Sequence, residues 1–331
     1  MSITKECVNW IKDYFKDNPD GKAIIGISGG KDSTIAAALC VEALGADRVI
    51  GVMMPQDYQT DIYDSKEVCD MLGITPFTIN IGRTCTVLMD WIVGSLTFAP
   101  HNKEYMPDAV TTVISNPMIK TNLPARIRMT TLYAVAALYP NSRVVNTCNC
   151  SEDYVGYSTK FGDAAGDFSP LGKLTVREVL EIGDELGLPE RLVHKAPSDG
   201  MCGKTDEDNL GFTYNELDDY ILGTGEVSDE TKAKIERLHK SSRHKYQPMP
   251  TFDPYLEKTI ALGKPVYDID QLTLFDEKSH VEGGPIVSGP NGVSAAINIE
   301  PINYGETDLQ KVAEALDKVI KTAGYAFKGE K

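Results

Sequence analysis

The sequence is poor in positive charge and has no long apolar run. Of its 331 residues, 48 are Asp or Glu and 33 are Lys or Arg, which gives a formal net charge of -15. A surface of that sign repels nucleic-acid backbone and anionic membranes. No apolar run reaches the length of a bilayer-spanning helix, and residues 1–15 lack the basic-then-apolar pattern of a secretion signal. These absences favour a cytoplasmic protein with no nucleic-acid or membrane partner.

The cysteines do not suggest a disulfide framework. There are seven of them, an odd number, in a chain without a secretion signal. Cysteines in such a chain are usually reduced thiols. We therefore expect no disulfide bonds, which agrees with a cytoplasmic location.

Short β-branched runs alternate with helical stretches in the first half of the chain. Strands are expected at 23–28, 48–55, 74–81 and 143–147, and helices at 33–45, 60–72 and 118–139. This alternation predicts an α/β fold, a Rossmann-like doubly wound sheet of about five parallel strands with helices on both faces. Ligands bind such sheets beyond the carboxyl ends of the strands, so the loops after the strands are candidate binding segments.

The second half of the chain is mainly helical up to residue 254. Helices are expected at 175–187, 214–222 and 228–242, with a surface loop at 195–211. The first of these helices begins with the capping-box pair Thr175 and Glu178. Residues 1–254 are therefore expected to form the main domain.

Residues 255–331 differ in composition and form a C-terminal extension. A Gly/Pro-rich stretch comes first, then an expected strand at 294–302 and an amphipathic helix at 307–324. No motif in this extension points to a function. We expect catalysis to persist largely intact without it.

The stretch GISGGKDS, residues 26–33, joins the first expected strand to the first expected helix. A glycine-rich turn in that place points backbone N–H groups at an anion, and the helix dipole adds to the attraction. A Walker A loop is excluded, because only three residues separate Gly26 from Gly30 and because Asp32 follows the lysine. A carboxylate beside phosphate is repulsive unless a divalent cation lies between them, so we expect Mg²⁺ at Asp32. The alternative is a tight turn that only caps the helix.

Several segments carry a family resemblance. SGGKDS, residues 28–33, resembles the SGGxDS pyrophosphate loop of the N-type ATP pyrophosphatases, which cleave ATP between the α and β phosphates. Four further segments resemble the ammonia-dependent NAD synthetases of that superfamily: 122–129, 146–171, 195–223 and 241–248. The resemblance runs from about residue 1 to 254 with the motifs in family order, so 1–254 is expected to be the NAD synthetase domain.

The resemblance implies a ligase of NAD biosynthesis that forms a C–N bond. In this family the nicotinate carboxylate of deamido-NAD attacks the α-phosphate of ATP and pyrophosphate leaves. Ammonia then displaces AMP from the adenylate to give NAD. ATP as co-substrate, Mg²⁺ as cofactor and a homodimer are implied as well.

The implied magnesium ligands are Asp32 and Glu152, which together with Lys31 are also the implied catalytic residues. For Glu152 the alternative is an acid that only complements a helix N-terminus. The implied ATP-binding residues are Gly26, Ile27, Ser28, Gly29, Gly30, Lys31, Asp32, Ser33, Gln59, Thr147 and Ser198.

The implied deamido-NAD-binding residues are Arg126, Lys160, Asp167, His244 and Lys245. Each has an ordinary alternative, such as a solvated helix arginine or a loop salt bridge between Lys160 and Asp167. Clustering of basic residues within motif segments of an acidic protein favours an anionic ligand instead.

Three positions depart from the family pattern. Asn146 stands where many relatives have glycine, and Asp199 stands where a small residue is common. Val176 stands where other members often place a lysine that contacts ATP. Lys173 and Arg177 are the candidates to replace that lysine.

The nitrogen donor is expected to be free ammonia. The phosphate loop begins at Gly26, so we expect no nitrilase-type glutaminase domain before it. Position 2 is Ser2, not the cysteine of an N-terminal nucleophile glutaminase, and GMCGK ends in Lys204 instead of the glycine of a triad elbow. A separate glutaminase chain that delivers ammonia is the alternative.

Two other functions stay open from the residues alone. A tRNA-modifying member of the same superfamily could use Cys148 and Cys150, a C-x-C pair beside the expected site, for sulfur transfer. The acidic charge argues against that reading, and two small half-buried thiols are the ordinary explanation. A nucleotide sensor that binds without turnover is the other alternative.

Overall fold

The chain divides into two units, residues 1–249 and residues 250–331. A parallel sheet forms the centre of the first unit. The computed structural model describes residues 2–59, 62–98, 116–195, 206–252, 286–288 and 294–296. The strands are β1 (Ala23–Gly26), β2 (Val49–Met53), β3 (Pro76–Thr78) and β4 (Arg143–Val144), in the order β3-β2-β1-β4. All neighbours pair in parallel, and Val145 adds a parallel bridge to Phe168. The expected sheet of about five strands is thus four strands and one bridge in the described residues.

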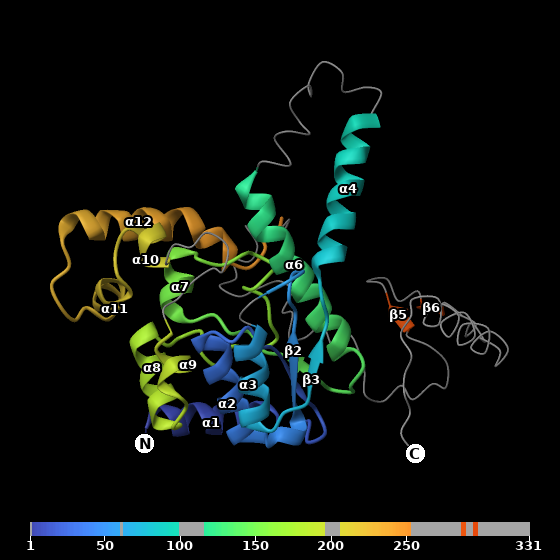
Figure 1. Cartoon of the computed structure of the whole chain (residues 1–331), viewed down its shortest axis with the longest axis horizontal. Helices are drawn as coiled ribbons and strands as arrows, with labels where there is room; N and C mark the ends of the chain where they lie inside the picture. Colours follow the sequence, from blue (N-terminus) through green and yellow to red (C-terminus); the bar gives the residue numbers. More distant parts are fainter. Residues whose placement is uncertain are drawn as a thin grey trace. The chain divides into compact units, whose positions relative to one another are not determined.

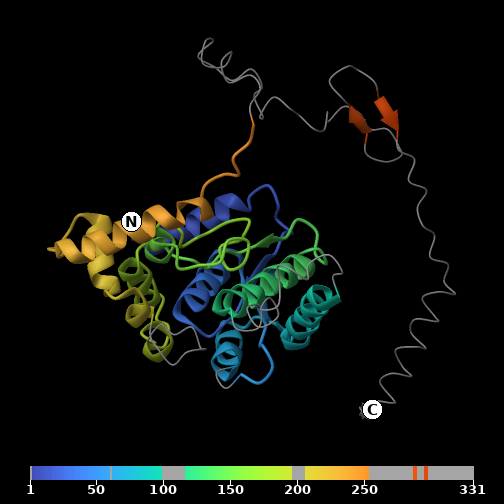
Figure 2. The same ribbon diagram turned by 90° about the horizontal axis from the view of Figure 1, so that it is seen from above.

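Helices cover both faces of this sheet, as the alternating pattern predicts (Figures 1 and 2). One face carries α1 (Ile3–Tyr14), α2 (Lys31–Leu44), α3 (Ile62–Leu72), α8 (Val176–Glu185) and α9 (Glu190–Val193). The other carries α4 (Gly82–Phe98) and α6 (Pro117–Ala136). Successive strand residues point to opposite faces, so buried Ile25 packs under α2 while buried Ile24 packs under α6. The doubly wound α/β prediction is confirmed.

A third apolar cluster joins the later helices to the side of the sheet. Its helices are α7 (Cys150–Val155), α11 (Tyr214–Leu222) and α12 (Asp229–Ser242), packed with the start of α8. The short elements nearby are α10 (Asp206–Leu210) and the 3₁₀ turns η1 (Ala46–Arg48) and η2 (Arg243–Lys245). The capping boxes of α8 and α11 fix where both helices begin.

Some expectations need correction. Helix α4 has no counterpart among the expected elements, and residues 206–210 of the expected loop form α10 because three acids begin its first turn. In the second unit, β5 (Ile286–Ser288) pairs antiparallel with β6 (Ser294–Ala296). Strand β5 falls in the Gly/Pro-rich stretch, and β6 forms the beginning of the strand expected at 294–302. The helix expected at 307–324 lies outside the described residues. Among the described helices, none has the length and hydropathy to cross a membrane.

Candidate active site

The loop between β1 and α2 is shaped by a glycine that no other residue can replace without strain. Gly29 has φ +77°, and a Cβ there would lie 2.8 Å from Cβ of Asp64 and 2.9 Å from the backbone nitrogen of Ser65, both in α3. That φ favours glycine, and the close approach of α3 leaves no room for a side chain. The loop therefore turns sharply at the carboxyl end of β1, where ligands bind in open α/β sheets.

Two serine hydroxyls hold this loop in shape. Ser28 Oγ lies 2.9 Å from Ser33 Oγ and accepts a hydrogen bond from Gly30 N. Ser33 Oγ donates to Gly30 O and accepts from Ser28 N. The serines thus preorganise the turn in addition to the ligand contacts that the sequence assigns to them.

The N-terminus of α2 faces the loop without a side-chain cap. Gly30 is the N-cap residue and makes no side-chain capping hydrogen bond. The first N–H groups of a helix lack intrahelical partners and carry the positive end of the dipole, so this terminus suits a phosphate. Ile27 is buried in the core and donates its backbone N–H to Val52 O, so it anchors the loop and offers no side chain to a ligand.

Lys31, Asp32 and Glu152 come together beside the loop, as the sequence analysis expects. Lys31 Nζ lies 2.7 Å from Asp32 Oδ2 and 3.6 Å from Glu152 Oε1, and Lys31 is only 6% exposed. Burial acts to lower the pKa of Lys31, but the charges of Asp32 and Glu152 outweigh it and the pKa is raised. Lys31 is therefore a cation throughout the physiological pH range.

One ammonium cannot neutralise two buried carboxylates. Burial, and next the charge of Asp32, raise the pKa of Glu152 although Lys31 acts to lower it. Carboxylate oxygens are hard ligands, and Mg²⁺ is commonly held by one or two of them together with substrate phosphates. No three His, Cys, Asp or Glu side chains converge on a metal-sized point in the described residues. The residues present thus fit a magnesium ion held jointly by these carboxylates and by oxygens of a bound polyphosphate.

Two residues that the sequence analysis does not identify support this centre. Asn149 is fully buried, and its Oδ1 accepts from Glu152 N at 3.0 Å while its Nδ2 donates to Asp32 Oδ1 at 3.0 Å. The N-x-x-E spacing of Asn149 and Glu152 is a capping pattern that could have identified it. Asp206 is also buried and its charge acts on Lys31 and Glu152, but no sequence signal links this distant residue to the loop.

Four of the five implied dinucleotide residues lie close together. Arg126 Nε donates to Lys160 O, and Lys160 Nζ donates to His244 O at 2.7 Å. Lys245 Nζ donates to the backbone oxygens of Gly156 and Ser158 at 2.7 and 2.8 Å. Gly156 caps α7, whose first turn carries Glu152, so this basic cluster and Glu152 lie at opposite ends of one short helix.

Asp167 does not join that cluster in the described structure. Its Oδ2 accepts from Val144 N at 2.7 Å, and its Oδ1 accepts from Tyr133 OH at 3.2 Å. Tyr133 is seven residues beyond Arg126 in α6, about 10 Å along the helix axis. Asp167 makes no salt bridge with Lys160, so that ordinary alternative is wrong.

The remaining implied ATP-binding residues, Thr147, Gln59 and Ser198, lie outside the loop between β1 and α2. Thr147 follows the bridge residue Val145 at the carboxyl end of the sheet, and Gln59 is half-buried after β2. Ser198 lies outside the described residues, as does Asp199.

The departures from the family pattern have local explanations. Asn146 is buried and its Nδ2 donates to Asp163 O at 2.8 Å, while its Oδ1 accepts from Cys148 N and Ser169 Oγ. Val176 is buried among apolar side chains at the start of α8.

The candidate substitutes for a lysine at Val176 differ in their contacts. Arg177 is half-exposed and forms a 2.9 Å ion pair with Asp219. Lys173 is exposed. Of the two, Lys173 is therefore the one without an ion pair among the described residues.

Comparison with known proteins places this site in a family. The NAD synthase family model matches residues 3–249. The NH(3)-dependent NAD(+) synthetase of Carboxydothermus hydrogenoformans is 36% identical over 245 residues, which are 73% of this chain and 93% of that protein. The structure of NMN synthetase from Francisella tularensis covers 76% of this chain and 97% of its own, at 34% identity and a TM-score of 0.65. The NH3-dependent NAD synthetase structure from Campylobacter jejuni covers the same shares at 25% identity and a TM-score of 0.54.

The family match covers the whole of the first unit, including the pyrophosphate loop, Glu152 and the basic cluster around Lys160. The chain belongs to the NAD synthase family.

Proposed function

We propose that this protein is an ammonia-dependent NAD synthetase. It converts deamido-NAD, ATP and ammonia to NAD, AMP and pyrophosphate through an adenylated carboxylate. The observation that carries the proposal is the joint placement of buried Lys31 and partly buried Asp32 and Glu152 beside a glycine loop at the sheet edge. Asp32 and Glu152 would hold Mg²⁺, which when bound neutralises charge on the polyphosphate.

In the first step, the adenylation of the acceptor carboxylate, different residues bind the phosphates and the acceptor. The loop N–H groups and the α2 terminus bind the β and γ phosphates, so the charge that develops on the leaving pyrophosphate meets fixed dipoles and the Lys31 cation. The basic cluster around Lys160 and Lys245 holds the anionic acceptor and brings its carboxylate to the α-phosphate. Ammonia then attacks the adenylate carbonyl, and AMP leaves with the bond electrons.

The acceptor has two candidates that the relatives suggest. The curated relatives are NAD synthetases, whereas one similar structure is an NMN synthetase. We favour deamido-NAD because Arg126, Lys160 and His244 are linked into one extended basic surface. Nicotinate mononucleotide is the competing acceptor.

One incubation separates these possibilities. Purified protein receives ATP, Mg²⁺, ammonium and either acceptor, and NAD, NMN, AMP and pyrophosphate are followed, with Asp32→Ala as the inactive control. NAD formed one-for-one with AMP, absent with glutamine in place of ammonium, supports the proposal. Preferred NMN formation would change the acceptor, and tight nucleotide binding without pyrophosphate release would favour a sensor.

The tRNA alternative is weakened by the cysteines. Cys148 is buried and Cys150 half-buried, and burial raises the pKa of both thiols. Such thiols carry little thiolate and transfer sulfur poorly. All six cysteines in the described residues are free, which agrees with the proposed reducing cytoplasm.

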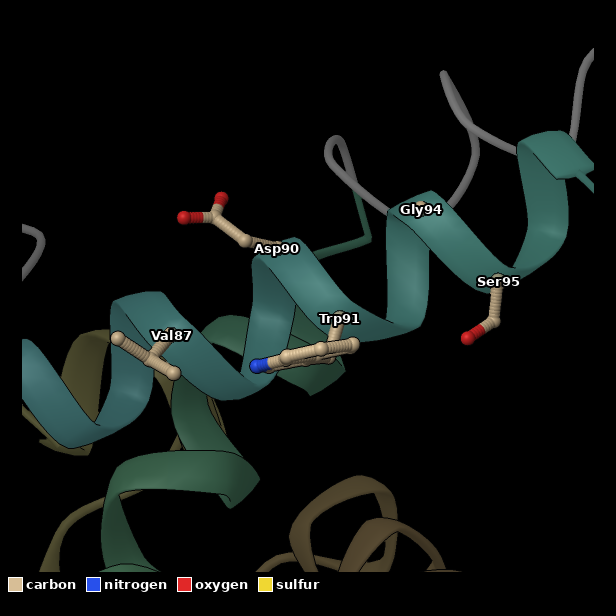
Figure 3. A pocket seen from close by; sticks show the side chains of 5 residues that line it. All are labelled: Val87, Asp90, Trp91, Gly94 and Ser95. Atoms are coloured by element: carbon tan, nitrogen blue, oxygen red, sulfur yellow. The ribbon is translucent and has the colours of Figure 1, made fainter.

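We also propose that the protein forms a homodimer through α4. Val87, Leu88, Trp91 and Ile92 expose apolar surface on this helix, and Trp91 is 72% exposed. Figure 3 shows Trp91 and Val87 with Asp90, Gly94 and Ser95 along a shallow open hollow. An apolar row of this kind is unusual on a monomer and suits a second copy of the same helix.

Residues 255–331 are proposed to be dispensable for catalysis. The family match ends at residue 249, so every residue assigned to the chemistry precedes this extension.

A further inference from the structure

Tyr214, the first residue of α11, has a buried hydroxyl with no hydrogen-bond partner among the described residues. Only 5% of the residue is exposed. Leaving a buried hydroxyl unpaired is unfavourable, and a phenylalanine would avoid that cost. The hydroxyl therefore needs an explanation that the fold by itself does not give.

The ring of Tyr214 lies next to Lys31, the residue that contacts Asp32 and Glu152. Lys31 Nζ lies 5.7 Å from the ring centroid, and the same nitrogen is 2.7 Å from Asp32 and 3.6 Å from Glu152. Tyr214 also belongs to the apolar cluster that contains Val155 and Val176. The Tyr214 backbone N–H donates to Glu207 at 2.9 Å, which fixes the start of α11.

The hydroxyl is held as a proton donor. Burial is the main cause that raises the pKa of Tyr214, followed by the negative charges of Glu152, Asp206 and Asp32. The neutral O–H form therefore persists throughout the physiological range. Asp32 and Glu152 would hold the metal in the proposed function, so a neutral O–H donor near them would suit a ligand that supplies an additional acceptor oxygen.

We propose that the Tyr214 hydroxyl donates a hydrogen bond to an oxygen of the bound magnesium–polyphosphate. This oxygen belongs either to a phosphate or to a metal-bound water, and the chemistry of recognition is the same. The inference rests on the proposed function, because it assumes that ATP and magnesium occupy the loop of Gly29 and Asp32. Tyr214 is then a binding residue of the first step.

The test compares Tyr214→Phe with the wild type in two measurements. Calorimetry with a non-hydrolysable ATP analogue and Mg²⁺ is expected to show about tenfold weaker binding, as for one lost hydrogen bond to a charged group. The thermal midpoint without ligand is expected to be unchanged or higher, because the unpaired oxygen is removed. Tyr220→Phe is the matched control. Tyr220 also lies on α11, but its hydroxyl donates a hydrogen bond to Glu236 of α12 at 3.1 Å.

The outcomes separate the inference from the function. Equal analogue affinity in wild type and Tyr214→Phe, or a clear drop in the ligand-free midpoint, would overturn the inference while the function stands. No analogue binding by the wild type would overturn both. Titration with Mn²⁺ alone distinguishes the acceptors, because weaker Mn²⁺ binding by the variant indicates metal-bound water and unchanged binding indicates a phosphate oxygen.

Discussion

At the residue scale, the candidate site holds more negative than positive charge away from water. Lys31 supplies one positive charge to Asp32 and Glu152, with Asp206 close enough to act on it electrostatically. Buried carboxylates in excess of cations destabilise a fold unless a ligand compensates them. Asn149 bonds to Asp32 and to the Glu152 backbone, so the imbalance is held in place. Such an arrangement prepares the site for a cation.

Glu152→Gln tests this imbalance through pH. The pKa of Glu152 is higher in the folded protein than in the unfolded chain. As the pH rises from the unfolded pKa to the folded pKa, the unfolded chain loses this proton first, so the free energy of unfolding decreases. Between pH 5 and pH 8 the metal-free wild type is expected to lose about 1–3 kcal/mol relative to the variant, since one pKa unit is worth about 1.4 kcal/mol. Denaturant unfolding in EDTA measures the difference at each pH.

The same variant is expected to lose most of its NAD-forming activity, because the remaining carboxylate holds the metal alone. A stability difference that is constant or shrinks with pH would contradict the charge argument. Glu42→Gln is a suitable control, since Glu42 is exposed near the end of α2, while Asp32 lies in the first turn of that helix.

At the element scale, α7 links the two halves of the site. Asn149 caps its start next to Glu152, and Gly156 ends it with φ +73°. The Gly156 carbonyl accepts from Lys245, so one short helix sets the position of Glu152 relative to Lys245. A tight contact with α12 holds its end, because a Cβ on Gly156 would lie 2.0 Å from Cβ of Ser242.

Gly156→Ala is therefore expected to be more damaging than an ordinary glycine replacement. The positive φ costs about 1–2 kcal/mol by itself, and the clash with Ser242 adds to it, for a total of about 3 kcal/mol or more. Gly223→Ala is the matched control, because Gly223 ends α11 with φ +67° and has nothing within 4 Å of its would-be Cβ. Equal losses of unfolding free energy in the two variants would contradict the role of the α7–α12 contact.

At the scale of the whole molecule, the α4 face tests the proposed homodimer. Trp91→Glu places a charge on the apolar side chain that is most exposed among those described in α4. Light scattering is expected to give a dimer mass for the wild type and a monomer mass for the variant. Lys66→Glu, a change of charge on α3, serves as control. A monomeric wild type would remove the proposal.

Removal of residues 255–331 tests the extension. The truncated protein is expected to keep NAD-forming turnover within about twofold, because all residues assigned to the site precede residue 250 and distant sites contribute independently. The assay is the NAD and AMP measurement described above, with circular dichroism to verify folding. Loss of all activity in a folded, soluble truncation would contradict the expectation.

Much of the fold could be predicted from local patterns. The strands near Ile24 and Ile50 read as apolar runs, and the α8 capping box was visible as Thr175 and Glu178. Helix α4 was not predicted, and Asp167 was assigned to the ligand although its carboxylate bonds Val144 and Tyr133. Those features depend on contacts between distant segments, which carry no periodic signal.

The sequence by itself determined the parallel sheet and the glycine loop after β1, and it gave the expectation of a divalent cation at Asp32, because glycine spacing, hydroxyls and acid order are local properties of the chain. Tertiary structure decided which partners complete the site. Asn149, Asp206 and Tyr214 reach Asp32 and Lys31 only when α7, α10 and α11 pack beside α2. The physical reason is burial, since it removes water from Lys31 and Glu152 and leaves the Tyr214 hydroxyl unpaired.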